Sequence, residues 1–147
     1  MTGNGGGSAT EAPRNYVLLG DGAGSFTPFQ LDIQADTYSL VIGDVDDDGR
    51  NDIIFGNLFR TLKLLRNVGD AESLEFAPPV DLAAVDFPYD LKLGDVNADN
   101  HPDLVVGISG GENFVLLNDG EGSFGGKIEL PGGKLKTYAI ALLDVDS

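Results

Sequence analysis

The 147-residue chain contains no cysteine and no tryptophan, and it has a single methionine and a single histidine. Without cysteine, no disulfide can hold the fold and no thiolate can act as a nucleophile. The lone histidine, His101, is not accompanied by a recognisable nucleophile and base. These absences lead us to expect a protein that is not an enzyme.

Positive charge is also scarce. Nine Lys and Arg residues stand against 24 Asp and Glu residues, which gives a formal net charge of -15. Because nucleic-acid binding needs cations that neutralise phosphates, this balance argues against a nucleic-acid partner. No apolar run approaches the length of a membrane span. The N-terminus lacks the apolar core of a signal peptide, so a signal would lie outside this segment or would have been removed.

Helical signals are missing as well, since no segment sustains a 3.6-residue apolar period. Residues 1–13 are rich in Gly, Ser and Thr, a composition typical of a flexible linker. The rest of the chain consists of short apolar runs separated by Gly, Asp and Asn. This pattern predicts β-strands joined by turns.

One of these turns is dense in carboxylates. Counted from Asp44, aspartates occupy positions 1, 3, 5 and 9, and Gly49 occupies position 6; the carboxylates are Asp44, Asp46, Asp48 and Asp52. Asp and Gly are ordinary turn residues, but four carboxylates within nine residues repel one another without a cation. Hard cations such as Ca²⁺ take six to eight oxygen ligands, so we predict a Ca²⁺ site here, with Arg50 at position 7 offering its backbone carbonyl.

The loop resembles the first part of an EF-hand but departs from it at position 12. An EF-hand has a bidentate Glu there, whereas this chain has Phe55 at the end of the apolar run Ile53–Phe55. Such a run is typical of a strand, as is Val41–Ile42 before the loop. The loop is therefore predicted to join two strands of a hairpin rather than two helices.

The loop recurs along the chain. A second copy places ligands at the same positions, with Asn100 in place of the glycine and the carbonyl of His101 at position 7; the ligands are Asp95, Asn97, Asp99 and Asp103. A third copy opens with Asp144 and Asp146 at the end of the sequence. Because charge count tunes such sites, the loop at Asp44, with four carboxylates, is expected to bind Ca²⁺ more tightly than the loop at Asp95, with three.

A second motif repeats out of phase with the first. Residues 18–26 (LLGDGAGSF) match residues 116–124 (LLNDGEGSF), and a degenerate copy begins LLRNVGD at residue 64. A repeat of about 50 residues with four short strands in each period predicts β-propeller blades. The tyrosines and phenylalanines fall mostly at repeat positions and are expected to pack in the core.

This combination of motifs resembles the FG-GAP or VCBS repeat, from which integrin α-chain propellers and many bacterial surface proteins are built. The resemblance covers residues 15–147. It implies calcium-binding propeller blades in which the Asp/Asn loop joins the first two strands of each blade.

The expected fold class is therefore all-β: a partial β-propeller of two complete four-stranded blades with a half blade at each end. The expected boundaries are a half blade at 14–36, blades at 37–87 and 88–133, and the start of another blade at 134–147. The rest of the propeller is expected in a longer parent chain; the alternative is an obligate oligomer whose copies complete the ring.

The expected function is a calcium-binding repeat module of an extracellular or cell-surface protein, mediating adhesion or an interaction with a protein or glycan. Two alternatives remain open. One is a lectin-like, carbohydrate-binding propeller. The other is the accessory propeller of a polysaccharide-degrading enzyme.

Overall fold

A computed structural model of the chain describes residues 15–31, 33, 36–57, 61–70, 73–132, 134 and 136–143. Within these ranges the fold is all-β, with ten strands in three antiparallel sheets and no helix. It follows that no described helix could cross a membrane. The chain divides into two compact units, Met1–Asp36 and Thr37–Ser147. The predicted linker at 1–13 lies outside the described residues.

The described part of the first unit contains one β-hairpin, formed by β1 (Asn15–Gly20) and β2 (Phe26–Leu31). Its turn closes around Asp21, whose carboxylate accepts hydrogen bonds from the backbone N–H of Ala23 at 2.8 Å and of Ser25 at 3.0 Å. These two bonds favour the charged form and lower the pKa of the Asp21 carboxyl. The hairpin therefore forms where the sequence predicts one.

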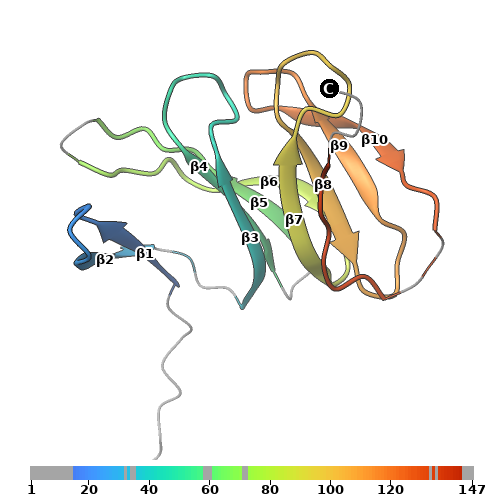
Figure 1. The fold of residues 1–147 in the computed structure, drawn as a ribbon, viewed down its shortest axis with the longest axis horizontal. Coiled ribbons are helices and arrows are strands. Elements are labelled where there is room, and N and C mark those ends of the chain that lie inside the picture. The colour runs from blue at the N-terminus through green and yellow to red at the C-terminus, as the bar shows by residue number, and fades with distance from the viewer. Residues whose placement is uncertain are drawn as a thin grey trace, which may run out of the picture. The chain divides into compact units, whose positions relative to one another are not determined.

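The second unit contains two four-stranded sheets, and in each sheet the strands lie side by side in chain order (Figure 1). The first sheet consists of β3 (Thr37–Gly43), β4 (Asp52–Asn57), β5 (Thr61–Leu65) and β6 (Val80–Ala84). The second sheet consists of β7 (Pro88–Gly94), β8 (Asp103–Ile108), β9 (Phe114–Asn118) and β10 (Phe124–Glu129).

The second strand of each sheet is buried along its whole length. Both strands carry an uninterrupted apolar run, Ile53–Phe55 in β4 and Leu104–Val106 in β8, as expected of a strand covered on both faces. A single apolar cluster joins the two sheets; its members are Val45, Ile54, Leu62, Leu64, Val85, Leu91, Leu104, Val106, Ile108, Phe114 and Leu116. The two sheets therefore share one core.

Small residues on the first sheet allow this close packing. A Cβ atom built on Gly56 would lie 2.5 Å from Pro88 Cγ, and one built on Gly43 would lie 2.7 Å from Leu93 Cδ1. Nearby, the Ser39 hydroxyl donates a hydrogen bond to the carbonyl of Pro88 at 2.7 Å. Strands β3 and β7 are thus the elements through which the sheets meet.

Residues 136–143 pack against the second sheet in the way that β7 packs against the first. A Cβ atom on Gly107 would lie 2.9 Å from Ile140 Cδ1, and one on Gly94 would lie 2.7 Å from Leu142 Cδ1. The backbone N–H of Ile140 also donates to the Asp90 carboxylate at 2.6 Å. The same packing therefore recurs one repeat further along the chain.

The apolar pattern of residues 137–143 predicts the first strand of a further blade, but this prediction is wrong for the described structure, because the segment has no regular ladder there. Among the described residues, its backbone pairing consists of an isolated bridge between Lys136 and Ser109 and a bond from Thr137 N–H to the Ile108 carbonyl at 3.3 Å. A strand needs a row of such bonds, and this segment is held mainly by side chains. Residues 144–147 lie outside the described ranges.

The outer strand of the first sheet also starts later than the sequence predicts. The pattern predicts a strand at 76–82, but β6 begins at Val80, and Phe76 lies before it in an isolated bridge to Asn67. Pro78 and Pro79 lie between them, and proline cannot donate to a ladder.

The register of the middle repeat differs by one residue from the sequence alignment. Leu65 pairs with Ile53 in the first sheet, as Leu116 pairs with Leu104 in the second. Asn67 therefore corresponds to Asn118. The residue before it, Arg66, corresponds to Leu117, an apolar position in the other copies.

The tyrosines are less buried than expected. Tyr16, Tyr38 and Tyr138 are 49%, 45% and 62% exposed. Tyr38 stacks on Tyr89 with ring centroids 5.6 Å apart, and Tyr89 meets Tyr138 edge-on at 5.5 Å. Instead of packing in the core, Tyr38, Tyr89 and Tyr138 form a row of contacting rings that crosses from one repeat to the next.

Candidate metal centre

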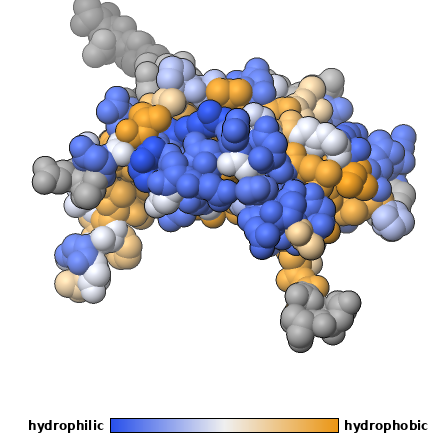
Figure 2. All heavy atoms as spheres, turned by 90° about the horizontal axis from the view of Figure 1, so that it is seen from above, coloured by the Kyte–Doolittle hydropathy of each residue, from blue (hydrophilic) through white to orange (hydrophobic). Residues whose placement is uncertain are grey.

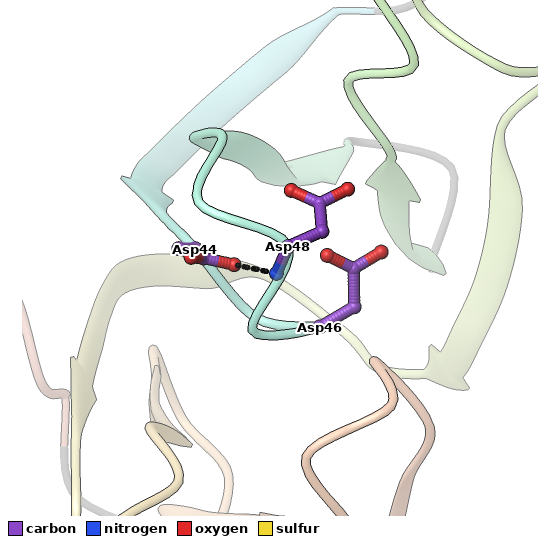
Figure 3. A group of neighbouring side chains, drawn as sticks. All are labelled: Asp44, Asp46 and Asp48. Atoms are coloured by element: carbon purple, nitrogen blue, oxygen red, sulfur yellow. Dashed lines mark hydrogen bonds between the residues drawn. The ribbon is translucent and has the colours of Figure 1, made fainter.

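The loop between β3 and β4 brings three carboxylates together. One oxygen each of Asp44, Asp46 and Asp48 lies within 4.8 Å of the others. Figure 3 shows the carboxylates of Asp46 and Asp48 side by side, with Asp44 across the turn. Figure 2 views the molecule from the side on which this loop lies and shows a broad hydrophilic area there. The predicted ligands at positions 1, 3 and 5 thus converge.

Backbone hydrogen bonds shape the loop around these carboxylates. Asp44 accepts bonds from the N–H of Asp48 at 3.2 Å and of Gly49 at 2.8 Å, and the first of these is drawn in Figure 3. Asp48 in turn accepts the N–H of Arg50 at 2.9 Å. Gly49 has a φ of 85°, which glycine adopts without steric cost. The turn is therefore organised by the same side chains that would bind an ion.

Asp46 is the least satisfied of the three carboxylates. Its side chain is 17% exposed, and its Oδ1 atom is buried with no hydrogen-bond partner among the described residues. Burial raises the pKa of the Asp46 carboxyl, and the negative charge of Asp48 raises it further. Since an unpaired buried oxygen beside two other carboxylates suits a hard cation, the residues present fit Ca²⁺.

The aspartates at position 9 are placed differently from the other predicted ligands. Asp52, which is 1% exposed, accepts the N–H of Val45 at 3.2 Å through one oxygen and the N–H of Asn67 at 2.8 Å through the other. Burial raises the pKa of its carboxyl, although the bonds from Asn67 and Val45 oppose this. Asp52 therefore ties the ends of the first and third strands together behind the loop.

Asp103 repeats this arrangement in the second sheet. It is fully buried, and it accepts the N–H of Val96 at 3.0 Å and of Asn118 at 2.9 Å. The Asn118 amide also donates to the carbonyl of Val45 at 2.9 Å and thereby reaches the first sheet. Each position-9 carboxylate thus holds together the strand ends that flank a loop.

The second loop is closed more completely by its own hydrogen bonds. Asp95 accepts the N–H groups of four residues, and the bond from Asn100 is the main cause of its lowered pKa; the donors are Asn97, Ala98, Asp99 and Asn100. The Asn97 amide donates to the Asp99 carboxylate at 2.7 Å. With Asn97 in the middle, two carboxylates and one amide lie where the first loop has three carboxylates.

The sequence predicts that the two position-7 residues offer only their carbonyls, but both side chains also make contacts. The Arg50 guanidinium pairs with the Asp48 carboxylate, and its Nε donates to the carbonyl of Asn67 at 2.8 Å. The Nδ1 atom of His101 lies 3.0 Å from the carboxylate of Asp47, which links the two loops. Asp144 and Asp146 of the third loop lie outside the described residues.

One residue beside the first loop was missed by the sequence reasoning. The Nε of Arg66 lies 3.9 Å from the Asp46 carboxylate, and its terminal nitrogen donates to the carbonyls of Glu121 at 2.9 Å and Gly122 at 3.1 Å. Arg66 stands where the second copy has Leu117. This exchange of an apolar residue for a positively charged one can be seen in the sequence only when these two residues are aligned with each other.

A family model described as an FG-GAP-like repeat matches residues 44–106 and again residues 95–147. The two matches together span the second unit from the start of the first carboxylate loop onward. No curated protein and no solved structure gave a match to the chain.

Proposed function

The chain belongs to the FG-GAP-like repeat family, whose repeats are β-propeller-type modules often found in extracellular proteins, and on this premise we propose that it is a calcium-binding part of a β-propeller. The propeller acts outside the cell or at its surface, where it presents loops to a protein or glycan. It has no catalytic role of its own.

The observation that carries the calcium proposal is the convergence of Asp44, Asp46 and Asp48, of which Asp46 has a buried oxygen with no hydrogen-bond partner among the described residues. These three carboxylates and the carbonyl of Arg50 would hold the ion, with Asp52 behind them. Bound Ca²⁺ neutralises the carboxylates and cross-links the turn. Oxygen-only donors of this kind suit Ca²⁺ better than softer metals.

The same assignment extends to the other copies of the loop. In the second copy the ligands would be Asp95, Asn97, Asp99 and the carbonyl of His101, with Asp103 behind them. In the third copy, Asp144 and Asp146 remain the predicted first ligands.

The propeller proposal is supported by packing that repeats from sheet to sheet. Leu91 on β7 is 1% exposed because the first sheet covers it, whereas its counterpart on β3, Leu40, is exposed. Ile42, two residues along β3, is exposed too. A further sheet placed on β3 as the first sheet is placed on β7 would bury both side chains, as in successive propeller blades.

Calorimetry with Ca²⁺ tests the calcium proposal. We expect wild-type protein to bind with a dissociation constant of about 10⁻⁴ to 10⁻³ M, the range of extracellular modules. At a hundredfold excess over that constant, Ca²⁺ should add about 2.7 kcal/mol to the free energy of unfolding. Asp46→Ala should remove one binding event, because it takes away both the oxygen ligands and the charge at the centre of the loop.

The matched control is Asp81→Asn. Asp81 is a well-exposed aspartate on β6 that pairs with Lys63, and its substitution should leave Ca²⁺ binding unchanged. Equal melting temperatures in millimolar Ca²⁺ and in EDTA, together with no heat of binding, would refute the proposal.

A further inference from the structure

Two arginines lie against the carboxylates of the first loop, and the second loop has neither of them. Arg50 pairs directly with Asp48. Arg66 lies beside Asp46. In the second loop the corresponding residues are His101 and Leu117. The two loops therefore differ in their cations as well as in their carboxylates.

The arginines cancel the charge advantage that the first loop has from its carboxylates. Residues 44–52 contain five aspartates, which Arg50 and Arg66 reduce to a net charge of three negative. Residues 95–103 contain three aspartates and no Lys or Arg, which also leaves three negative charges when His101 is neutral. The number of carboxylates alone therefore does not determine which loop binds Ca²⁺ more tightly.

Arg66 is held in a position from which it attracts Asp46 without satisfying it. Its terminal nitrogen is anchored by the carbonyls of Glu121 and Gly122 in the turn between β9 and β10. Its Nε is buried and lies 3.9 Å from Asp46 Oδ2, which is too far for a hydrogen bond. The guanidinium thus contributes positive potential at the site, while Asp46 Oδ1 remains unpaired among the described residues.

Arg50 acts by binding directly to a carboxylate that Ca²⁺ would coordinate. Its guanidinium is bound to Asp48 Oδ2, and its Nε is fixed by the carbonyl of Asn67. The other oxygen of Asp48 already accepts the N–H of Arg50. A cation that coordinates Asp48 must therefore share or displace an existing charged partner.

We propose that Arg50 and Arg66 set the cation affinity of the first loop: they are internal counter-ions that weaken Ca²⁺ binding there and hold the loop folded when no cation is bound. This inference rests on the proposed function. It predicts that the first loop keeps its shape over a wider range of cation concentration than its carboxylates alone would allow.

The test compares wild type with Arg50→Gln, Arg66→Gln and the double variant. Glutamine keeps a donor for the carbonyl partners of each arginine but removes the positive charge. Calorimetry should follow the binding event that Asp46→Ala abolishes. Each single variant should bind Ca²⁺ about three- to tenfold more tightly, since two like charges several ångströms apart repel even in water.

A second measurement separates this role from simple structural support. In EDTA the melting temperature of each variant should fall, while the rise on adding Ca²⁺ should become larger than in wild type. An arginine that only packs the structure would lower stability in both conditions and would not tighten binding. Lys63→Gln is the matched control, because Lys63 pairs with Asp81 on the same sheet; its affinity should stay within about twofold of wild type.

The outcomes distinguish the inference from the proposed function. Wild-type binding with unchanged affinity in the arginine variants overturns the inference and leaves the calcium site standing. Binding that appears only in the double variant supports the inference. Absence of binding in wild type and in the double variant overturns both.

Discussion

At the scale of single residues, the aspartates of each loop divide into two groups. Those at positions 1, 3 and 5 of the first loop face the turn, where their charges are available to a ligand. Asp52 and Asp103 are buried instead, and each spends both oxygens on backbone N–H groups. One carboxylate motif therefore combines ligand residues with a residue that fixes the strand ends.

Asp52→Ala should destabilise the cation-free protein by about 3 kcal/mol, because it leaves two buried backbone donors without acceptors. Urea denaturation in EDTA measures this loss. Asp81→Ala, which removes an exposed partner of Lys63, should cost less than about 1 kcal/mol. Similar losses for the two variants would contradict the structural role of Asp52.

At the scale of elements, the contact between the sheets depends on places where a side chain cannot be accommodated. Gly56 on β4 is such a place, because a Cβ atom there would lie 2.5 Å from the rigid ring of Pro88 and 3.0 Å from Ser39 Oγ. The leucine contacts of Gly43 and Gly94 involve the flexible ends of side chains and can give way more easily.

Gly56→Ala should therefore lower the free energy of unfolding by about 1–3 kcal/mol through overpacking. Gly125→Ala is the control, since a Cβ atom on Gly125 would meet nothing within 4 Å and its φ is not in the left-handed region. Thermal or urea unfolding of the two variants checks the difference. If the Gly56→Ala protein were as stable as the Gly125→Ala protein, the contact between the sheets would have room for a side chain at residue 56.

The elements also show how far the sequence could predict the structure. Strands β4 and β8 and both carboxylate loops could be predicted because apolar runs and Asp spacing are local signals. The register of the middle repeat could not, because its turn runs from Asn67 to Phe76, three residues longer than the turn from Asn118 to Phe124. The role of Arg66 was missed for the same reason, since it depends on that register and on a second sheet.

At the scale of the whole molecule, the dominant feature is a net charge of -15 that the fold distributes unevenly. Burial raises the pKa of Asp46 and of Asp52, so the folded chain takes up protons at these two sites before the unfolded chain does. Backbone bonds lower the pKa of Asp95, so the folded chain releases that proton more readily than the unfolded chain. The two groups of carboxyls therefore have opposite effects on how the stability of the fold depends on pH in acid.

Without a cation, stability should rise as the pH falls from 7 toward 3.8, the ordinary aspartate value, because protonation of Asp46 and Asp52 favours the folded state. Below that value, protonation of Asp95 should reverse the trend. Ca²⁺ should stabilise less at lower pH, since protons compete for Asp46. Melting temperatures from pH 3 to pH 7, with Ca²⁺ or EDTA, check this; a Ca²⁺ effect that grows on acidification would contradict it.

The row formed by Tyr38, Tyr89 and Tyr138 gives the protein an optical property. The chain has no tryptophan and only four tyrosines, and three of them lie with neighbouring ring centroids 5.5–5.6 Å apart. Phenol chromophores this close couple excitonically, so their near-ultraviolet circular dichroism depends on how successive repeats are juxtaposed. Separation of the repeats would change this near-ultraviolet signal even if each sheet kept its far-ultraviolet spectrum. The near-ultraviolet signal of the unmodified protein therefore reports on contact between repeats.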